Sequence, residues 1–167
     1  MVECTLEQCN RMDAEMFVEE FGDVYESSPW VAERVVGERP FESASALRQA
    51  MQSVVDSAST DRQRELLRAH PDLGAQTEMT DASVAEQESA GLDQLSKAQY
   101  ERFQRLNDRY RNRFGFPFIM AVRDADPDTI ESAMADRVEN DPTEEFQTAL
   151  EQVHTIAKLR LETGITE

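Results

Sequence analysis

The segment LLRAHPDLG, residues 66–74, contains the clearest break in an otherwise helical pattern. Its first residues continue an apolar helical repeat, and His70 is followed directly by Pro71. A proline disfavours the α-helical conformation of the residue before it, so the sequence predicts that the helix ends here and that His70 leaves it. His70 is one of two histidines in the chain and is expected to hold a fixed position between helices.

Outward from this break, apolar residues recur at helical spacing, and capping residues mark where helices begin. Two capping boxes are predicted, Thr60 with Gln63 before the break and Ser96 with Gln99 after it. Gly115 is expected to end the helix that the second box opens. The predicted helices cover approximately residues 6–12, 13–24, 28–37, 43–57, 60–70, 81–89, 96–114, 127–138 and 142 onward.

Two further segments complete the predicted fold. After a polar loop to about Thr80, Asp81 or Ser83 is expected to cap the short helix that ends near Ser89. Residues 116–123 are apolar without a helical period, so they predict an extended, buried segment. No strand-rich block, internal repeat or linker interrupts the pattern. The predicted fold class is therefore all-α, a single compact multi-helix domain over residues 1–167.

The composition restricts partners and location. The formal net charge is −17, and the 17 basic residues include only two lysines against 34 acidic residues. A field of this sign repels nucleic acid and anionic membrane surfaces, so neither is expected as a partner. The balance resembles the acidic surface of halophilic proteins, in which salt screens self-repulsion. With no export signal and no long apolar stretch, we expect a cytoplasmic protein that does not cross a membrane.

Three side chains near the ends of regular segments are candidates for chemistry. His70 has an intrinsic pKa of about 6.5 and suits an acid or base, although a capping role is the alternative. Glu86 alone carries no signal in so acidic a chain. Arg123 closes an apolar segment, so its guanidinium needs an anion or carbonyl opposite it, or a surface partner such as Asp124 or Asp126.

Two patterns that resemble metal sites are interpreted otherwise. Cys4 and Cys9 lie five residues apart, which fits no zinc motif, and we expect two reduced thiols on or under a short helix. Aspartates at 124, 126 and 128 alternate like the start of a calcium loop. That loop also needs glycine and glutamate where Thr129 and Ala135 stand, so no calcium site is predicted.

Two basic features are expected to be structural. His154 lies beside the apolar stripe of the last helix and is interpreted as a structural residue. Four arginines lie on one stripe of the helix over 96–114, and we call them the arginine row. Among so many acidic residues they are expected to pair within the chain or across a subunit contact rather than bind nucleic acid. The arginine row consists of Arg102, Arg105, Arg109 and Arg113.

Several motifs together resemble one family. They are HPDLG at 70–74, EQ at 86–87 followed by SAGL at 89–92, LN at 106–107, RFGFPF at 113–118, and the closing Arg123. Upstream, FGDVYE at 21–26, SPWVA at 28–32 and RPF at 39–41 extend the likeness. The chain is similar over about residues 5–162 to the 2-oxo-4-hydroxy-4-carboxy-5-ureidoimidazoline (OHCU) decarboxylases, which form (S)-allantoin in the last step from urate.

The resemblance implies a site and a mode of action. The family is helical, cofactor-free and usually dimeric, so a homodimer without metal or cofactor is expected, acting on a small anionic ureidoimidazoline. By matching motif positions, His70 is the catalytic acid/base, and Glu86 and Arg123 are the other catalytic residues. The implied substrate-binding positions are Pro71, Ser83, Gln87, Arg123 and the backbone at Phe118 and Ile119.

Two alternatives stay open from the sequence. One is a non-catalytic acidic helical interaction module, in which the arginine row docks a partner and His70 is structural. The other is a decarboxylase or lyase of a related ureide, which differs only in the shape of the pocket. Convergence of His70, Glu86 and Arg123 on one small ligand discriminates the enzyme from the module.

Overall fold

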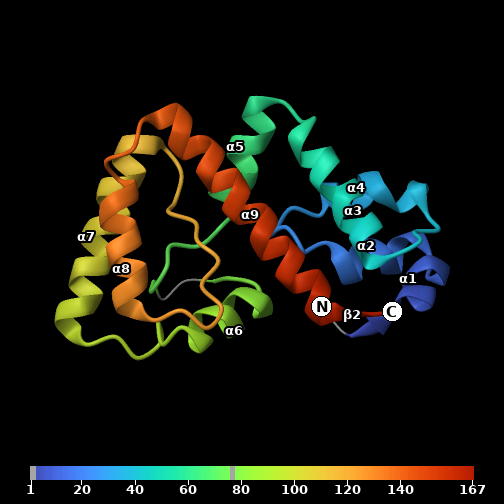
Figure 1. The fold of residues 1–167 in the computed structure, drawn as a ribbon, viewed down its shortest axis with the longest axis horizontal. Coiled ribbons are helices and arrows are strands. Elements are labelled where there is room, and N and C mark those ends of the chain that lie inside the picture. Colours follow the sequence, from blue (N-terminus) through green and yellow to red (C-terminus); the bar gives the residue numbers. More distant parts are fainter. Residues whose placement is uncertain (1–2, 76–77) are drawn as a thin grey trace. The chain divides into compact units, whose positions relative to one another are not determined.

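The computed structural model describes residues 3–75 and 78–167, and their regular secondary structure is helical apart from one short strand pair (Figure 1). The strands β1 (Cys4–Thr5) and β2 (Ile165–Thr166) pair in parallel. This confirms the all-α class. The helices are α1 (Leu6–Arg11), α2 (Ala14–Phe21), α3 (Trp30–Val35), the 3₁₀ turn η1 (Val36–Glu38), α4 (Ala44–Asp56), α5 (Thr60–Arg68), α6 (Asp81–Ser89), α7 (Lys97–Phe114), α8 (Pro127–Arg137) and α9 (Pro142–Gly164).

The described residues form two compact units. The terminal unit contains the chain up to Ala69 together with His154–Glu167, and the central unit contains His70–Val153. Organisation as a single domain stays a prediction. In the described part of the chain, no helix combines the length and apolar character that a membrane span requires.

The terminal unit is held together by apolar packing and by the polar contacts of His154 and Arg160. Its core includes Phe17 and Phe21, whose ring centroids lie 4.8 Å apart. His154 bonds through Nδ1 to the Tyr25 hydroxyl at 2.8 Å and through Nε2 to Asp56 at 2.9 Å, which confirms its structural interpretation. Arg160 is buried and donates to the Glu26 carboxylate at 3.1 Å.

The two cysteines also belong to the terminal unit, and both are free thiols, as expected. Cys9 is fully buried on α1. Burial, with a smaller contribution from the charge of the Cys4 thiolate, raises the pKa of the Cys9 thiol to about 11. Because the thiolate is the reactive form, Cys9 is an inert core residue at neutral pH.

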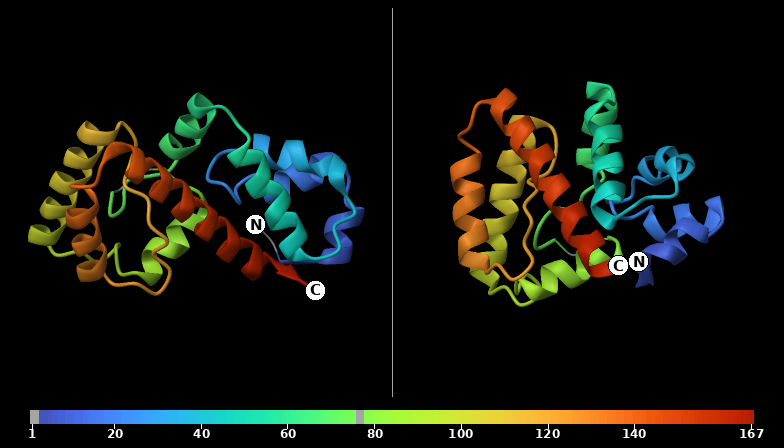
Figure 2. Two further views of the ribbon diagram at one scale, coloured as in Figure 1. Left: turned by 45° about the horizontal axis from the view of Figure 1, so that its top comes forward. Right: turned by 45° about the vertical axis from the view of Figure 1, so that its right-hand side comes forward.

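The central unit places α7 and α8 side by side, as Figures 1 and 2 both show. Gly115 ends α7 in the left-handed conformation with φ of 80°, as the sequence predicts. The chain from Phe116 to Val122 then runs without helix and is buried except at Met120 and Ala121, which are half-buried, as predicted for a non-helical segment in the core. Tyr110 packs its ring edge-on against Phe118, with centroids 5.5 Å apart.

Two predicted helix starts are displaced by one residue or more. Ser59, not Thr60, caps α5, and its side chain accepts from the Arg62 amide at 3.1 Å. Gln63 consequently faces the preceding helix and donates to the Val55 carbonyl at 2.9 Å. Thr80, not Asp81 or Ser83, caps α6. In both cases a second capping residue stands next to the predicted one, so the sequence left the exact start ambiguous.

The predicted box at Ser96 forms only in part. The Ser96 hydroxyl accepts from the Gln99 amide at 3.2 Å, so Ser96 is the N-cap of α7. The Gln99 side chain does not return to the cap but donates to Asp128 on α8 at 3.1 Å. Contact with a neighbouring helix has therefore replaced the local half of the motif.

Candidate functional site

His70 lies directly after α5, which ends at Arg68 with Ala69 as its cap residue. The break before Pro71 therefore falls where the sequence places it. The His70 residue is 6 % exposed, so its imidazole is removed from bulk water although it stands in an irregular loop. Ala69, and not His70, is the C-cap residue of α5.

The loop that begins at His70 turns back at Gly74, which adopts the left-handed conformation with φ of 78°. A Cβ at this position would lie 3.1 Å from Cδ1 of Leu95 and 3.2 Å from Cδ2 of Phe103, so the loop needs glycine here. The Gly74 amide donates to Oε1 of Gln87 at 3.1 Å in a buried bond. Gln87 thus fixes the far end of the histidine loop to α6.

Two side chains of α7 hold the middle of the same loop. Asn107 is 1 % exposed and donates through Nδ2 to the Leu73 carbonyl at 3.0 Å. Arg111 pairs through Nε with the Asp72 carboxylate at 2.8 Å. Since the backbone groups of a loop lack regular hydrogen-bond partners, these side chains supply the hydrogen bonds that a helix would form within itself.

Ser89 at the end of α6 links Glu86 with the segment that carries Arg123. Its hydroxyl donates to the Glu86 carbonyl at 2.7 Å and accepts from the Asp124 amide at 3.3 Å. Arg123 and Asp124 are the central residues of a turn closed by the Ala125 amide and the Val122 carbonyl at 3.0 Å. Asp124 has φ of 61°, in the left-handed region. The turn of Arg123 and the last turn of α6 are therefore neighbours.

Helix α6 is consequently the common support of the predicted site. Through Gln87 it holds the loop of His70, and through Ser89 it holds the turn of Arg123. The predicted site residues all lie in the central unit, and they differ in burial. Ser83, Gln87, Phe118 and Ile119 are buried, whereas Pro71, Glu86 and Arg123 are half-buried.

A surface cavity of about 600 Å³ lies beside α6. Of the predicted site residues, Gln87 lines it, whereas His70, Glu86 and Arg123 are not among its described lining residues. The Gln87 amide reaches Met79 through Nε2 at 3.5 Å to sulfur. The exposed side chains of Val84 and Tyr100 also line the cavity, together with the charged residues Glu88, Asp93 and Lys97.

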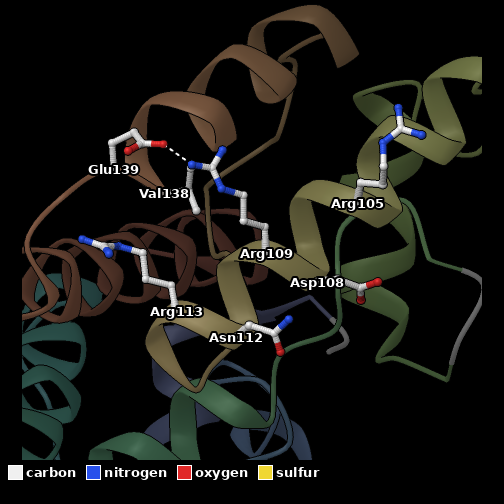
Figure 3. A pocket seen from close by; sticks show the side chains of 7 residues that line it. All are labelled: Arg105, Asp108, Arg109, Asn112, Arg113, Val138 and Glu139. Atoms are coloured by element: carbon white, nitrogen blue, oxygen red, sulfur yellow. Dashed lines mark hydrogen bonds and ion pairs between the residues drawn. The ribbon is translucent and has the colours of Figure 1, made fainter.

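The arginine row lies on α7 and pairs within the chain, which confirms the intramolecular interpretation for three of its members. Arg102 pairs with Glu131 at 2.5 Å, Arg109 pairs with Glu139, and Arg113 donates to the Asn140 carbonyl at 2.8 Å. Figure 3 shows three members of the row along one open hollow of about 730 Å³, with Glu139 facing Arg109. These exposed pairs contribute little to stability.

Comparison with known proteins identifies the family. The model of the OHCU decarboxylase family matches residues 10–162. The chain belongs to the OHCU decarboxylase family. An OHCU decarboxylase of Haloferax volcanii is 61 % identical over 161 residues, covering 96 % of each chain. A uric acid degradation bifunctional protein of Bacillus subtilis is 41 % identical over 98 % of this chain and 33 % of its own length.

Solved structures agree with the membership in the OHCU decarboxylase family. The crystal structure of (S)-allantoin synthase matches with a TM-score of 0.80 and 37 % identity, over 97 % of this chain. This chain spans 54 % of the length of that protein. The matched residues belong to both units of this chain.

Sequence reasoning missed the residues that hold the site of this OHCU decarboxylase family member in place. Asn107 is a polar residue beside the apolar stripe of α7, which was a usable signal. Ser89 stood inside the SAGL motif without an assigned role. Among the described residues, no group of three histidine, cysteine or acidic side chains has the arrangement of a metal site.

Proposed function

We propose that this chain decarboxylates OHCU and releases (S)-allantoin, with His70, Glu86 and Arg123 as its catalytic residues. The observation that carries the proposal is the family match over residues 10–162, which includes each motif that supplies these residues. The attachment of the His70 loop and the Arg123 turn to α6 supports a common site.

The reaction requires an acceptor for one electron pair and a donor for one proton. When the bond between the carboxylate and ring carbon 4 breaks, carbon dioxide leaves and its electron pair forms a double bond to carbon 5. The adjoining ring imine takes up the displaced pair on nitrogen. A proton then reaches carbon 5, the hydroxyl on carbon 4 loses its proton to become the carbonyl of allantoin, and the ring nitrogen that took up the pair is protonated, so that one proton is consumed in all. The protein must therefore hold the ring, stabilise the moving charge and protonate one face.

The residues of the central unit suit these tasks. His70 donates the proton that sets the (S) configuration, or handles the hydroxyl, in a loop fixed at its far end by Gln87. Arg123 neutralises the anionic substrate, since a guanidinium fits a carboxylate or ring carbonyl with two parallel bonds. Glu86 accepts from the ureido N–H groups or orients the imidazole. The ring of Pro71 and the backbone of Phe118 and Ile119 line the pocket, with Ser83 beside them.

Gln87 has a divided role in this proposal. Its Oε1 accepts from the Gly74 amide at 3.1 Å, and its Nε2 offers N–H donors for a substrate contact. That nitrogen now contacts the Met79 sulfur at 3.5 Å, a weak acceptor that a substrate oxygen would replace favourably. Gln87 would then bind the substrate with one end while it holds the histidine loop with the other.

We further propose a salt-adapted cytoplasmic homodimer that needs no cofactor and binds neither nucleic acid nor membrane. The net charge of −17 and the similarity to a chain of Haloferax volcanii support the salt adaptation. Screening at molar salt shortens the reach of the surface charges to about 3 Å, so they no longer repel an anionic substrate from Arg123. The arginine row is the candidate contact between subunits.

The test generates OHCU from urate in concentrated KCl and follows the optical activity of the allantoin formed. His70→Ala should lower the enzymatic rate about 10²- to 10⁴-fold without loss of helical circular dichroism. His154→Ala is the matched control, because it removes the other histidine, which bonds Tyr25 and Asp56 in the terminal unit. Racemic product at the spontaneous rate with the intact protein would refute the proposal.

A further inference from the structure

The non-helical segment after α7 is held by side chains of α8 and α9. Arg137 donates through Nη1 to the Ile119 carbonyl at 2.7 Å, and Gln152 accepts from the Ala121 amide at 2.9 Å. Two backbone groups on either side of Met120 are therefore fixed by side chains of neighbouring helices.

The guanidinium of Arg137 is itself fixed by a buried carboxylate. Its Nε donates to Oε1 of Glu145 at 2.6 Å, and the Glu145 side chain is fully buried. The same carboxylate accepts from the Tyr110 hydroxyl at 2.9 Å and from Nδ2 of Asn140 at 3.1 Å. With three donors converging on Glu145, Arg137 has little freedom to move.

Arg137 also packs on the side chain next to the carbonyl that it holds. Its guanidinium carbon lies 4.3 Å from the centroid of the Phe118 ring, and Tyr110 contacts that ring edge-on. One side chain thus fixes the ring of Phe118 and the backbone of Ile119. These are the two residues whose backbone is proposed to line the substrate pocket.

We propose that Arg137, oriented by Glu145, is a positioning residue that sets the place of the Phe118–Ile119 backbone against the substrate. The inference rests on the proposed function. Only arginine makes all three contacts at once, since its planar fork donates in two directions and stacks by its face. A lysine at this position keeps the positive charge but offers a single point of attachment.

The experiment compares Arg137→Lys with Arg109→Lys, in which an exposed arginine of the same unit undergoes the same change. Displacement of the binding backbone by about 1 Å should lower kcat/KM of Arg137→Lys 10- to 100-fold, whereas Arg109→Lys should keep the value of the intact protein. The protein concentration is chosen so that the catalysed rate exceeds the rate of spontaneous decarboxylation. The enantiomeric excess of allantoin should then fall in Arg137→Lys, because a misplaced ring is protonated on both faces.

Gln152 supplies a second and milder perturbation of the same segment. Gln152→Leu removes the acceptor for the Ala121 amide, and Gln152→Glu retains one. We expect Gln152→Leu to lose enantiomeric excess and Gln152→Glu to keep most of it. If Arg137→Lys does not fold, this pair tests the inference. Amide exchange over residues 118–122 should be faster in the defective variants at equal melting temperature.

The outcomes separate this inference from the proposed function. Absence of decarboxylation by the intact protein would refute the proposed function, while the exchange measurement would still report on the segment. Normal kcat/KM and enantiomeric excess in both Arg137→Lys and Gln152→Leu would overturn the positioning role. Losses that follow only the folded fraction of each variant would overturn it as well.

Discussion

Replacement of Gly74 by alanine should destabilise the central unit by about 2–4 kcal/mol. Its φ of 78° costs a residue with a Cβ about 1–2 kcal/mol. The added Cβ would also stand 3.1 Å from Leu95 and 3.2 Å from Phe103. Phe103 is fully buried and cannot retreat, so crowding adds roughly 1–2 kcal/mol.

Urea denaturation in concentrated KCl measures this change, with Gly37→Ala as the matched control. No atom lies within 4 Å of a Cβ built at Gly37, and its backbone is not left-handed. The control should therefore be neutral or stabilised by about 0.4–1 kcal/mol. Gly74→Ala should lower the melting temperature by roughly 4–16 °C, at about 2–4 °C per kcal/mol for a chain of this size.

Gly74→Ala must be less stable than Gly37→Ala if the left-handed turn at Gly74 is required. If Gly74→Ala stays within about 0.5 kcal/mol of Gly37→Ala, the loop of His70 does not depend on the left-handed turn. The bond from the Gly74 amide to Gln87 would then also be dispensable, since the shifted turn would have broken it without cost. A destabilised Gly74→Ala should in addition lose decarboxylation, because the turn fixes the far end of the histidine loop.

Two further predictions concern the thiol core and the surface charges. The pKa of Cys9 is raised from 9.0 to about 11 by burial, so the stability it contributes is complete below pH 9 and is lost between pH 9 and 11. Denaturation across this range should show a loss of up to about 2–3 kcal/mol that Cys9→Ala abolishes, and an equal slope in both proteins would contradict the assignment. Arg109→Ala should change the free energy of unfolding by less than about 1 kcal/mol, since its pair with Glu139 is exposed. The effect should shrink further in KCl. A larger cost that persists at high salt would contradict this expectation for the single chain and would support the proposed subunit contact at the arginine row.

The hydrophobic periodicity, together with the residues that cap and end helices, was sufficient to predict most of the fold. The α7 helix was predictable from Ser96 to Gly115 because its cap, its apolar stripe and its terminating glycine all agree. The extended segment at 116–122 followed from an apolar run without helical period. The start of α5 was wrong by one residue because Ser59 and Thr60 are both good caps, and only the direction of Gln63 toward α4 decides between them.

The candidate site residues were predictable from the sequence, but the side chains that hold their loops in place were not. His70 before Pro71 is a local signal, and the motif at 70–74 belongs to a known family pattern. The contacts that hold this loop join residues that lie 13 and 34 positions apart, from Gly74 to Gln87 and from Leu73 to Asn107. Helical or strand periodicity carries no information on which distant side chain satisfies a loop carbonyl.

These supports share one physical cause. The irregular segments that carry His70 and Arg123 lie partly out of water, His70 being buried and Arg123 half-buried, and their backbone groups have no regular helix or strand partner. Each bond therefore joins one side chain of a rigid helix to one backbone group of a loop. Leaving a buried group of this kind unsatisfied costs about 1–3 kcal/mol, so each bond stabilises its loop. Fixed placement of this kind suits the proposed reaction, whose rate depends on where a few charges and one proton stand. The supporting bonds are Gln87 to Gly74, Asn107 to Leu73, Ser89 to Asp124, Arg137 to Ile119 and Gln152 to Ala121.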